Sequence, residues 1–258
     1  MDIYFTIVLF IMGTVLGSFF NVCIYRIPNK ESIVNPPSHC YNCNNKLKAL
    51  DLVPILSWTL LRGKCRYCGQ EISSRYALVE LLTGILYVLV YKMYGLNIIA
   101  LYYILLISLL LIITFIDIDH YIIPDGLIIF GSVGAVIFNI LGQGISIKDS
   151  LLGAIICGGG MLVLIHLIEL IIKKEAMGGG DIKLFGMVGL FLGLKLGLLT
   201  ILLSVYIGAI CGVCSVIYSK IKKKEINTVI PYGPFISLGA LISVLYGSNI
   251  INWYMELF

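Results

Sequence analysis

The chain has 258 residues, a formal net charge of +4, and 59% hydrophobic against only 12% charged residues. Because a soluble domain carries about 25% charged residues, this composition and a mean hydropathy of +1.01 exclude an ordinary soluble protein. The 27 glycines are typical of helices that approach one another closely through small residues. We therefore predict an all-α, polytopic membrane protein whose surface meets lipid, and we expect no nucleic-acid partner.

Apolar stretches predict where the chain crosses the membrane. A hydrocarbon core of about 30 Å requires roughly 20 apolar residues of helix. By this criterion the sequence predicts about eight spans, near residues 3–25, 77–94, 97–116, 122–141, 151–172, 183–194, 196–219 and 230–252. The first begins with Asp2 and is long for a signal peptide, so we expect it to be a retained transmembrane helix. The sixth is short and interrupted by glycine, and the count of eight depends on it.

The basic residues predict the orientation of these spans. With eight crossings, only Lys92, Lys148 and Lys195 of the 18 lysines and arginines lie on one side. All the others, including Lys223 and Lys224, lie on the opposite side. The positive-inside rule makes the crowded side cytoplasmic. We therefore predict a plasma-membrane protein with its N-terminus and Phe258 outside.

One long polar segment, the insertion (residues 26–76), carries four cysteines in two CxxC pairs. Cys40 and Cys43 are followed after 21 residues by Cys65 and Cys68. Two such pairs can present four thiolates to a tetrahedral Zn²⁺. Four protein ligands leave no open position, so the predicted site is structural, and it would stabilise a segment too small for a large core. Reduced or disulfide-linked cysteines on a loop are the alternative interpretation.

Acidic residues at membrane depth are costly and indicate function. They occur at two predicted cytoplasmic turns: Asp117, Asp119 and Asp125 around the end of the third span, and Asp181 before the sixth. One carboxylate from each turn can share a proton with the other, and such a pair can activate water for hydrolysis. The glycines before Asp181 allow a substrate backbone to come close. For Asp119 and Asp125, helix capping or an interfacial position is the alternative.

Several blocks of sequence, in order, resemble the type IV prepilin peptidases, which are membrane aspartyl proteases of the GxGD class. The blocks are GSFFNVCIYRIP at 17–28, the double CxxC, RYALVELLT at 75–83, DIDH at 117–120 with PD at 124–125, GGGDIK at 178–183, and PYGPF at 231–235. Their order and number make the resemblance far more specific than a single GxGD motif.

The resemblance implies a function and its residues. Family members cleave the short basic leader of prepilins or pseudopilins after a glycine, at the cytoplasmic face of the membrane. The catalytic aspartates correspond to Asp117 and Asp181. The supporting residues are Gly178, Gly180, Asp119, Asp125 and Lys183.

The resemblance also implies a second activity. Many members methylate the new N-terminal amine with S-adenosylmethionine, and the RGKC stretch, here Gly63 and Lys64, is associated with that step. We therefore expect three parts: a first transmembrane helix (1–25), a methylation-associated zinc insertion (26–76) and a membrane-embedded peptidase core (77–258). A leader peptidase whose zinc insertion is only structural is the alternative.

Overall fold

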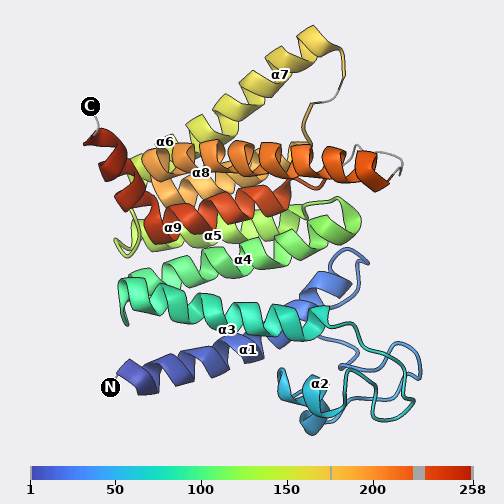
Figure 1. Cartoon of the computed structure of the whole chain (residues 1–258). Helices are drawn as coiled ribbons and strands as arrows, with labels where there is room; N and C mark the ends of the chain where they lie inside the picture. The colour runs from blue at the N-terminus through green and yellow to red at the C-terminus, as the bar shows by residue number, and fades with distance from the viewer. Residues whose placement is uncertain (1, 175, 223–229, 257–258) are drawn as a thin grey trace. The chain divides into compact units, whose positions relative to one another are not determined.

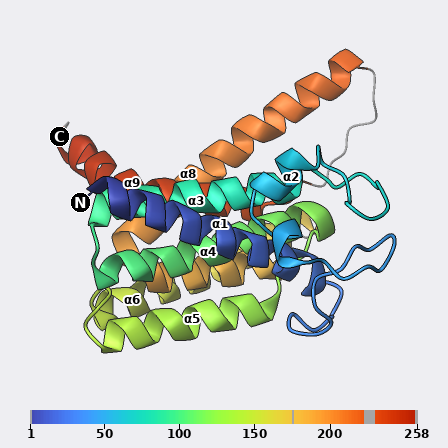
Figure 2. The same cartoon turned by 90° about the horizontal axis from the view of Figure 1, so that it is seen from below.

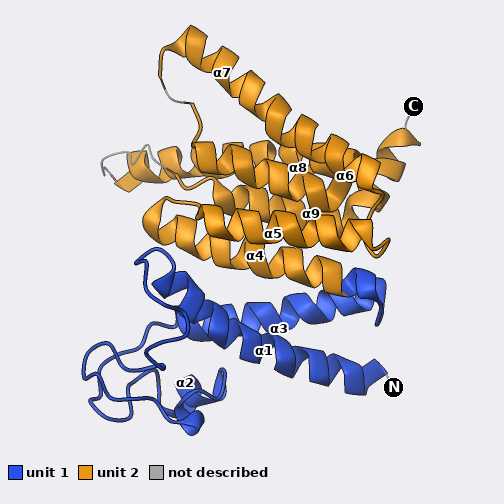
Figure 3. Cartoon of the chain, turned by 180° about the vertical axis from the view of Figure 1, so that it is seen from behind, with its two compact units in different colours: residues 1–100 blue, residues 101–258 orange. Residues whose placement is uncertain are grey.

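The structure is a computed structural model that describes residues 2–174, 176–222 and 230–256. Across these residues the chain is helical and contains no β-strand, only two isolated β-bridges. The predicted all-α class is therefore confirmed. The chain divides into two compact units, residues 1–100 and 101–258, which are described separately (Figure 3).

Unit 1 is built on two helices that pack side by side, α1 (Asp2–Arg26) and α3 (Arg75–Tyr94) (Figure 1). Glycines permit their close approach: a Cβ on Gly13 would lie 2.8 Å from the Cα of Gly84. Between them, the insertion contains only the 3₁₀ turn η1 (Ala49–Asp51) and the short helix α2 (Leu56–Leu60). With so little regular structure, the insertion needs other contacts to hold its loops together.

Unit 2 is a helical bundle in which α4, α5, α8 and α9 lie side by side, while α7 projects away from them (Figure 1). Viewed from below, α5 and α6 are neighbours (Figure 2). The elements are α4 (Ile98–His120), α5 (Asp125–Ile140), α6 (Ile147–Gly153), the π-helical segment η2 (Ala154–Gly160), α7 (Met161–Ile172), α8 (Gly179–Lys222) and α9 (Gly233–Met255).

Helix α8 reverses direction at Gly193, whose φ of 71° and ψ of −171° are not helical. A Cβ on Gly197 would lie 3.6 Å from the Cα of Gly189, so the arms 179–192 and 194–222 run back along each other. The backbone N–H of Leu194 donates a hydrogen bond to Asp149 (3.3 Å), which caps the start of the second arm. The two arms occupy the positions of the predicted sixth and seventh spans.

Glycines also bring the first arm of α8 against α6 and η2. A Cβ on Gly153 would collide with the carbonyl oxygen of Gly189, and one on Gly158 would lie 2.9 Å from the Cα of Gly186. Backbones that pack this closely leave no room for side chains between them. The first arm of α8, which carries Asp181, is therefore held by direct backbone contact.

Six helices among the described residues are long and apolar enough to cross a membrane: α1, α3, α4, α6 with η2 and α7, α8, and α9. The apolar helix α5 is shorter. The chain is thus a multi-pass membrane protein, while the count of eight crossings stays a prediction. The functional division at residues 25 and 76 also stays a prediction, and Lys223, Lys224 and Phe258 lie outside the described residues.

Candidate active site and metal centre

Asp117 lies near the C-terminal end of α4 and is only 5% exposed. The backbone N–H of Gly233, the first residue of α9, donates a hydrogen bond to its Oδ2 at 2.8 Å. A Cβ on Gly233 would itself lie 2.8 Å from this oxygen, so glycine is needed there. A residue 116 positions away in the sequence therefore fixes the Asp117 carboxyl group.

Asp181 lies in the first turn of α8 and is half-buried. Its carboxyl group interacts electrostatically with that of Asp117, so the ends of α4 and α8 bring the two predicted catalytic groups together. A Cβ on Gly178 would lie 3.1 Å from Asp181 Oδ2, and a Cβ on Gly180 would lie 3.1 Å from Ile123. Side chains at either glycine would therefore crowd the approach to the pair.

The other predicted residues of this site lie at its edge. Lys183 donates to Asp125 at 2.7 Å, and this exposed ion pair joins the first turn of α8 to the start of α5. Asp119 is exposed, two residues beyond Asp117. Of the four acidic residues at these turns, only Asp117 and Asp181 are at least partly withdrawn from the surface, which distinguishes them as the reactive candidates.

Two residues near the carboxyl pair had no role in the sequence analysis, although the block 231–235 was recognised. One is Gly233, which contributes only a backbone amide. The other is Tyr232, which interacts electrostatically with Asp181 and whose hydroxyl donates to Ser204 at 3.3 Å. The glycine before a proline marked a special backbone position, but nothing in the sequence connected it with Asp117.

In unit 1 the four predicted metal ligands, Cys40, Cys43, Cys65 and Cys68, come together. Their sulfurs all lie within 4.8 Å of one another, and the Sγ atoms of Cys40 and Cys68 are 3.8 Å apart. A Zn–S bond of about 2.3 Å in tetrahedral geometry requires sulfurs about 3.8 Å apart. The donor set therefore fits Zn²⁺ in both chemistry and spacing.

The two CxxC loops repeat one local structure. In the first knuckle (residues 40–45) the N–H of Cys40 donates to the carbonyl of Asn45, and in the second (65–70) the N–H of Cys65 donates to that of Gln70. The residue after each second cysteine, Asn44 or Gly69, has a positive φ. Glycine and asparagine tolerate this conformation best. Each knuckle is therefore shaped by its own backbone hydrogen bond and by a residue that tolerates a positive φ.

At two of the four cysteines the loops favour the thiolate form that binds metal. At Cys43 a backbone hydrogen bond from Asn45 lowers the pKa, but desolvation and the neighbouring Cys40 and Cys68 thiols outweigh it and raise the pKa to about 11. The backbone N–H of Gln70 is the main group that lowers the pKa of the Cys68 thiol, to about 7, and the backbone N–H of Cys43 likewise lowers the pKa of Cys40. A cysteine thiol ordinarily titrates near pH 8.5. Amide donors thus stabilise negative charge where a cation is expected.

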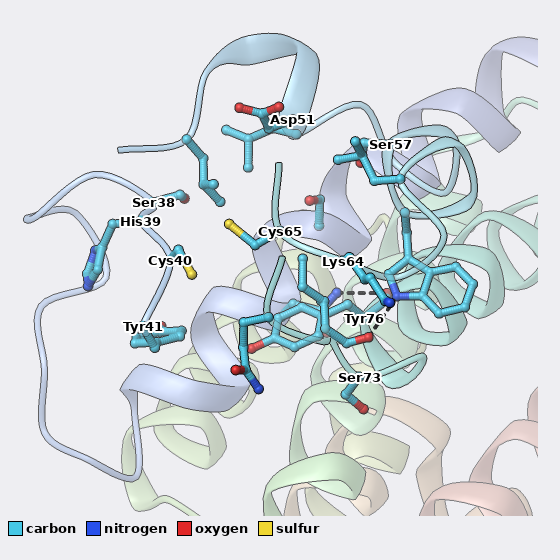
Figure 4. Close-up of a pocket in the computed structure, with 18 of the residues that line it drawn as sticks. Ser38, His39, Cys40, Tyr41, Asp51, Ser57, Lys64, Cys65, Ser73 and Tyr76 are labelled. Atoms are coloured by element: carbon cyan, nitrogen blue, oxygen red, sulfur yellow. Dashed lines mark hydrogen bonds between the residues drawn. The ribbon is translucent and has the colours of Figure 1, made fainter. Parts of the chain in front are cut away.

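Gly63 and Lys64 lie just before the second knuckle, and Lys64 lines a cavity of about 310 Å³ (Figure 4). Gly63 has a φ of 67°, and a Cβ there would lie 3.0 Å from the indole ring of Trp58. The Trp58 Nε1–H in turn donates to the carbonyl of Ile72 at 3.0 Å. Gly63 is therefore required by its backbone conformation and by the ring packed against it.

Comparison with known proteins connects both sites to one family. Residues 104–213, which include Asp117 and Asp181, match the type IV leader peptidase family. Residues 11–94, which include all four ligand cysteines, match the bacterial peptidase A24 N-terminal domain. The chain belongs to the type IV leader peptidase family. The resemblance noted in the sequence is thus confirmed, whereas the roles of individual residues stay predictions.

Similarity to family members extends over nearly the whole chain. The chain is 35% identical to the prepilin leader peptidase/N-methyltransferase of Aeromonas hydrophila, in an alignment that covers 99% of this chain and 95% of that protein. The chain is 34% identical to the protein of the same name from Bacillus subtilis, in an alignment that covers 97% of this chain and 98% of that protein. No solved structure matches the chain.

Proposed function

We propose that this protein cleaves the leader peptide of type IV prepilins or pseudopilins and methylates the N-terminus that cleavage creates. The observation that carries the peptidase activity is the convergence of Asp117 and Asp181 from the ends of α4 and α8. Full-length similarity to proteins named prepilin leader peptidase/N-methyltransferase supports both activities.

In the cleavage step, one carboxylate of the pair takes a proton from water, whose oxygen attacks the carbonyl carbon of the leader's last glycine. The other carboxyl group donates a proton to the leaving amine as the C–N bond breaks. Neighbouring acids divide these tasks because they do not readily ionise together. The Gly233 amide holds Asp117 in place, and Gly178 and Gly180 leave room for the substrate backbone.

In the methylation step, bound S-adenosylmethionine would supply a methyl group to the new N-terminal amine, which would lose a proton, while the electron pair of the broken C–S bond would leave on sulfur. We assign Lys64 to this activity because it lines the unit 1 cavity, and Gly63 because it packs against Trp58, which forms part of the wall of that cavity. Zn²⁺ held by the four cysteines would keep that wall in shape.

The substrate also sets the orientation that we propose. A prepilin leader is basic and cytoplasmic, so the carboxyl pair must be reached from the cytoplasm. The positive-inside distribution of lysines and arginines supports the same orientation in the plasma membrane.

The direct test is incubation of the purified, detergent-solubilised protein with a prepilin, with and without S-adenosylmethionine, followed by mass spectrometry. We expect leader loss in both reactions and the added mass of one methyl group only with the donor. Leader loss without methylation, repeated with a peptide that already begins with the mature N-terminus, would identify a leader peptidase alone. No leader loss would contradict the peptidase assignment.

A further inference from the structure

The cavity in unit 1 is lined by two sequence blocks that the functions above leave without a role. From the block at 17–28 come Asn21 and Arg26, and from the block at 75–83 come Tyr76 and Glu80. The insertion closes the cavity with both knuckles, Trp58 and Lys64. Its volume of about 310 Å³ lies at the lower end of the range of about 300–1,000 Å³ for small-molecule sites.

Arg26 is a buried cation with unused hydrogen-bonding capacity. It is 2% exposed, and its Nη1 donates to the carbonyl of Ser32 at 2.9 Å. Its Nε has no hydrogen-bond partner among the described residues. Burying such a group is costly unless an anion accompanies it. The guanidinium therefore provides a prepared site for a carboxylate, which it binds well in planar, two-point geometry.

Glu80 provides the opposite charge in the same cavity. It is 8% exposed, and its Oε2 accepts a hydrogen bond from the N–H of Ile55 at 2.7 Å. Its remaining contact is with the hydroxyl of Ser18, so its partners in the described residues are neutral. A buried carboxylate that only neutral donors hold attracts a cation.

The cavity wall also presents an aromatic surface and a further cation. The Trp58 indole, held by Ile72 and backed by Gly63, can stack on a planar base or face a positive charge. Lys64 adds a second positive charge, beside Cys65. A ligand for this site should thus carry a carboxylate, a cationic centre and an aromatic ring.

We propose that this cavity binds S-adenosylmethionine, with Arg26 holding its carboxylate and Glu80 facing its positively charged sulfonium. Trp58 provides the surface for the adenine ring, and the zinc knuckles hold the cavity wall. The proposal rests on the methyltransferase part of the proposed function and gives it a location. It also gives Gly63 a part in donor binding, since a side chain there would push on Trp58.

The first test uses the unmodified protein, so it does not depend on any variant folding. Hydrogen exchange of the full-length, zinc-loaded protein is measured with and without S-adenosylhomocysteine. We expect slower exchange in residues 38–47 and 51–76, which form the insertion side of the cavity. Protection confined to residues outside unit 1 would overturn the proposal while leaving the two activities untouched.

The second test measures affinity by calorimetry with two ligands that differ in charge. Arg26→Gln should weaken both S-adenosylmethionine and S-adenosylhomocysteine by roughly tenfold or more, because both carry the carboxylate. Arg26→Lys should lose less affinity for both ligands than Arg26→Gln does. Glu80→Gln should weaken S-adenosylmethionine by roughly fivefold more than S-adenosylhomocysteine, because only the former has a sulfonium charge.

Two exposed neighbours serve as matched controls, Lys30→Gln for Arg26 and Glu31→Gln for Glu80, and both should bind as the unmodified protein does. Prepilin cleavage and zinc content verify that each variant is folded. Full donor affinity in folded Arg26→Gln and Glu80→Gln would overturn the proposal, even if the protein methylates. A protein that cleaves but neither methylates nor binds either ligand would contradict the methyltransferase assignment itself, and the cavity proposal with it.

Discussion

At the scale of single residues, Asp117 and Asp181 should act as one unit, because one carboxyl group must accept a proton while the other donates one. Asp117→Asn and Asp181→Asn should each lower prepilin cleavage by roughly 10³-fold or more, and the double variant should lose little beyond that. Rates of leader loss provide the measurement. Both variants should still methylate a peptide with the mature N-terminus, since methylation requires no carboxyl pair.

The matched control for these variants is Asp125→Asn, which removes an acid from the same region. Asp125 lies in an exposed ion pair with Lys183, and such pairs contribute about 0–1 kcal/mol. Cleavage by this variant should stay within about threefold of the unmodified rate. If Asp125→Asn proved as inactive as Asp181→Asn, the choice of the catalytic pair would be wrong.

Gly233 offers a second test at this scale, because its amide positions Asp117. Gly233→Ala places a Cβ 2.8 Å from Asp117 Oδ2, so the hydrogen bond must lengthen or the carboxyl group must turn. We expect cleavage to fall by roughly tenfold or more without loss of zinc. Gly126→Ala, where a Cβ meets no atom within 4 Å, is the control and should remain active.

The sequence revealed residues whose chemistry lies in their side chains and missed those that act through the fold. The cysteine pairs and Asp181 were recognisable because thiolates at that spacing and acids at membrane depth have few other uses. Gly233 contributes an amide that every residue except proline possesses. Arg26 and Glu80 were quoted as parts of motifs, but polar residues near a membrane surface are usually solvated, so their burial could not be foreseen.

At the scale of elements, the insertion should depend on its metal. It has only one short helix and one 3₁₀ turn among its described residues, and structural zinc contributes directly to folding free energy. Cys40→Ser or chelation should release about one Zn²⁺ per chain and make residues 27–74 sensitive to protease, while the membrane helices remain resistant. Elemental analysis and limited proteolysis check this. Full zinc content in Cys40→Ser would contradict the ligand assignment.

The pKa of Cys68 gives this prediction a pH dependence. Because that pKa is lowered to about 7, the thiolate predominates above neutral pH and the thiol below it. Zinc affinity, measured by competition with a chelator, should therefore fall as the pH is lowered from 8 to 6, since each thiol must lose its proton to bind.

Two neighbouring glycines in η2 allow the effect of close packing on stability to be measured separately from the effect of helix propensity. A Cβ on Gly158 would lie 2.9 Å from the Cα of Gly186, whereas one on Gly159 meets no atom within 4 Å. Gly158→Ala should lower the free energy of unfolding by about 1–3 kcal/mol through overpacking, and Gly159→Ala should leave it unchanged or raise it by up to about 1 kcal/mol. Thermal unfolding in detergent measures both. Equal effects would show that the backbone contact does not matter.

The reversal of α8 was partly visible in the sequence. A short, glycine-interrupted apolar stretch predicted a separate sixth span, and the arm 179–192 lies there. The exact turning point was not predictable, because many glycines in this region can adopt a positive φ. The turn occurs at Gly193 because Asp149 caps the second arm from the first turn of α6. That contact depends on how α6 packs against α8, which the sequence does not reveal.

At the scale of the whole molecule, the orientation in the membrane can be tested by labelling. Gln143, exposed in the loop after α5, should react as Gln143→Cys with an impermeant maleimide from outside intact cells. Lys46→Cys and Lys220→Cys should react only after permeabilisation. Gln143 is preferable to Gly144, where an added Cβ would collide with Asn139. Serines at the exposed native Cys211 and Cys214 lower the background, and labelling of the exposed Cys68 is subtracted by using the same double-serine protein as the reference. Labelling of Lys46→Cys from outside would invert the orientation.

The glycine contacts between α6, η2 and the first arm of α8 have a mechanical consequence. The two backbones are in direct contact at two points, Gly153 with Gly189 and Gly158 with Gly186. Because the contacts are tightly packed, they resist sliding of one helix along the other. The backbone of the arm that carries Asp181 is thus held rigidly against α6 and η2. A substrate strand entering the site must therefore be accommodated by the parts around this arm, the glycines at 178–180 and the turn at Gly233.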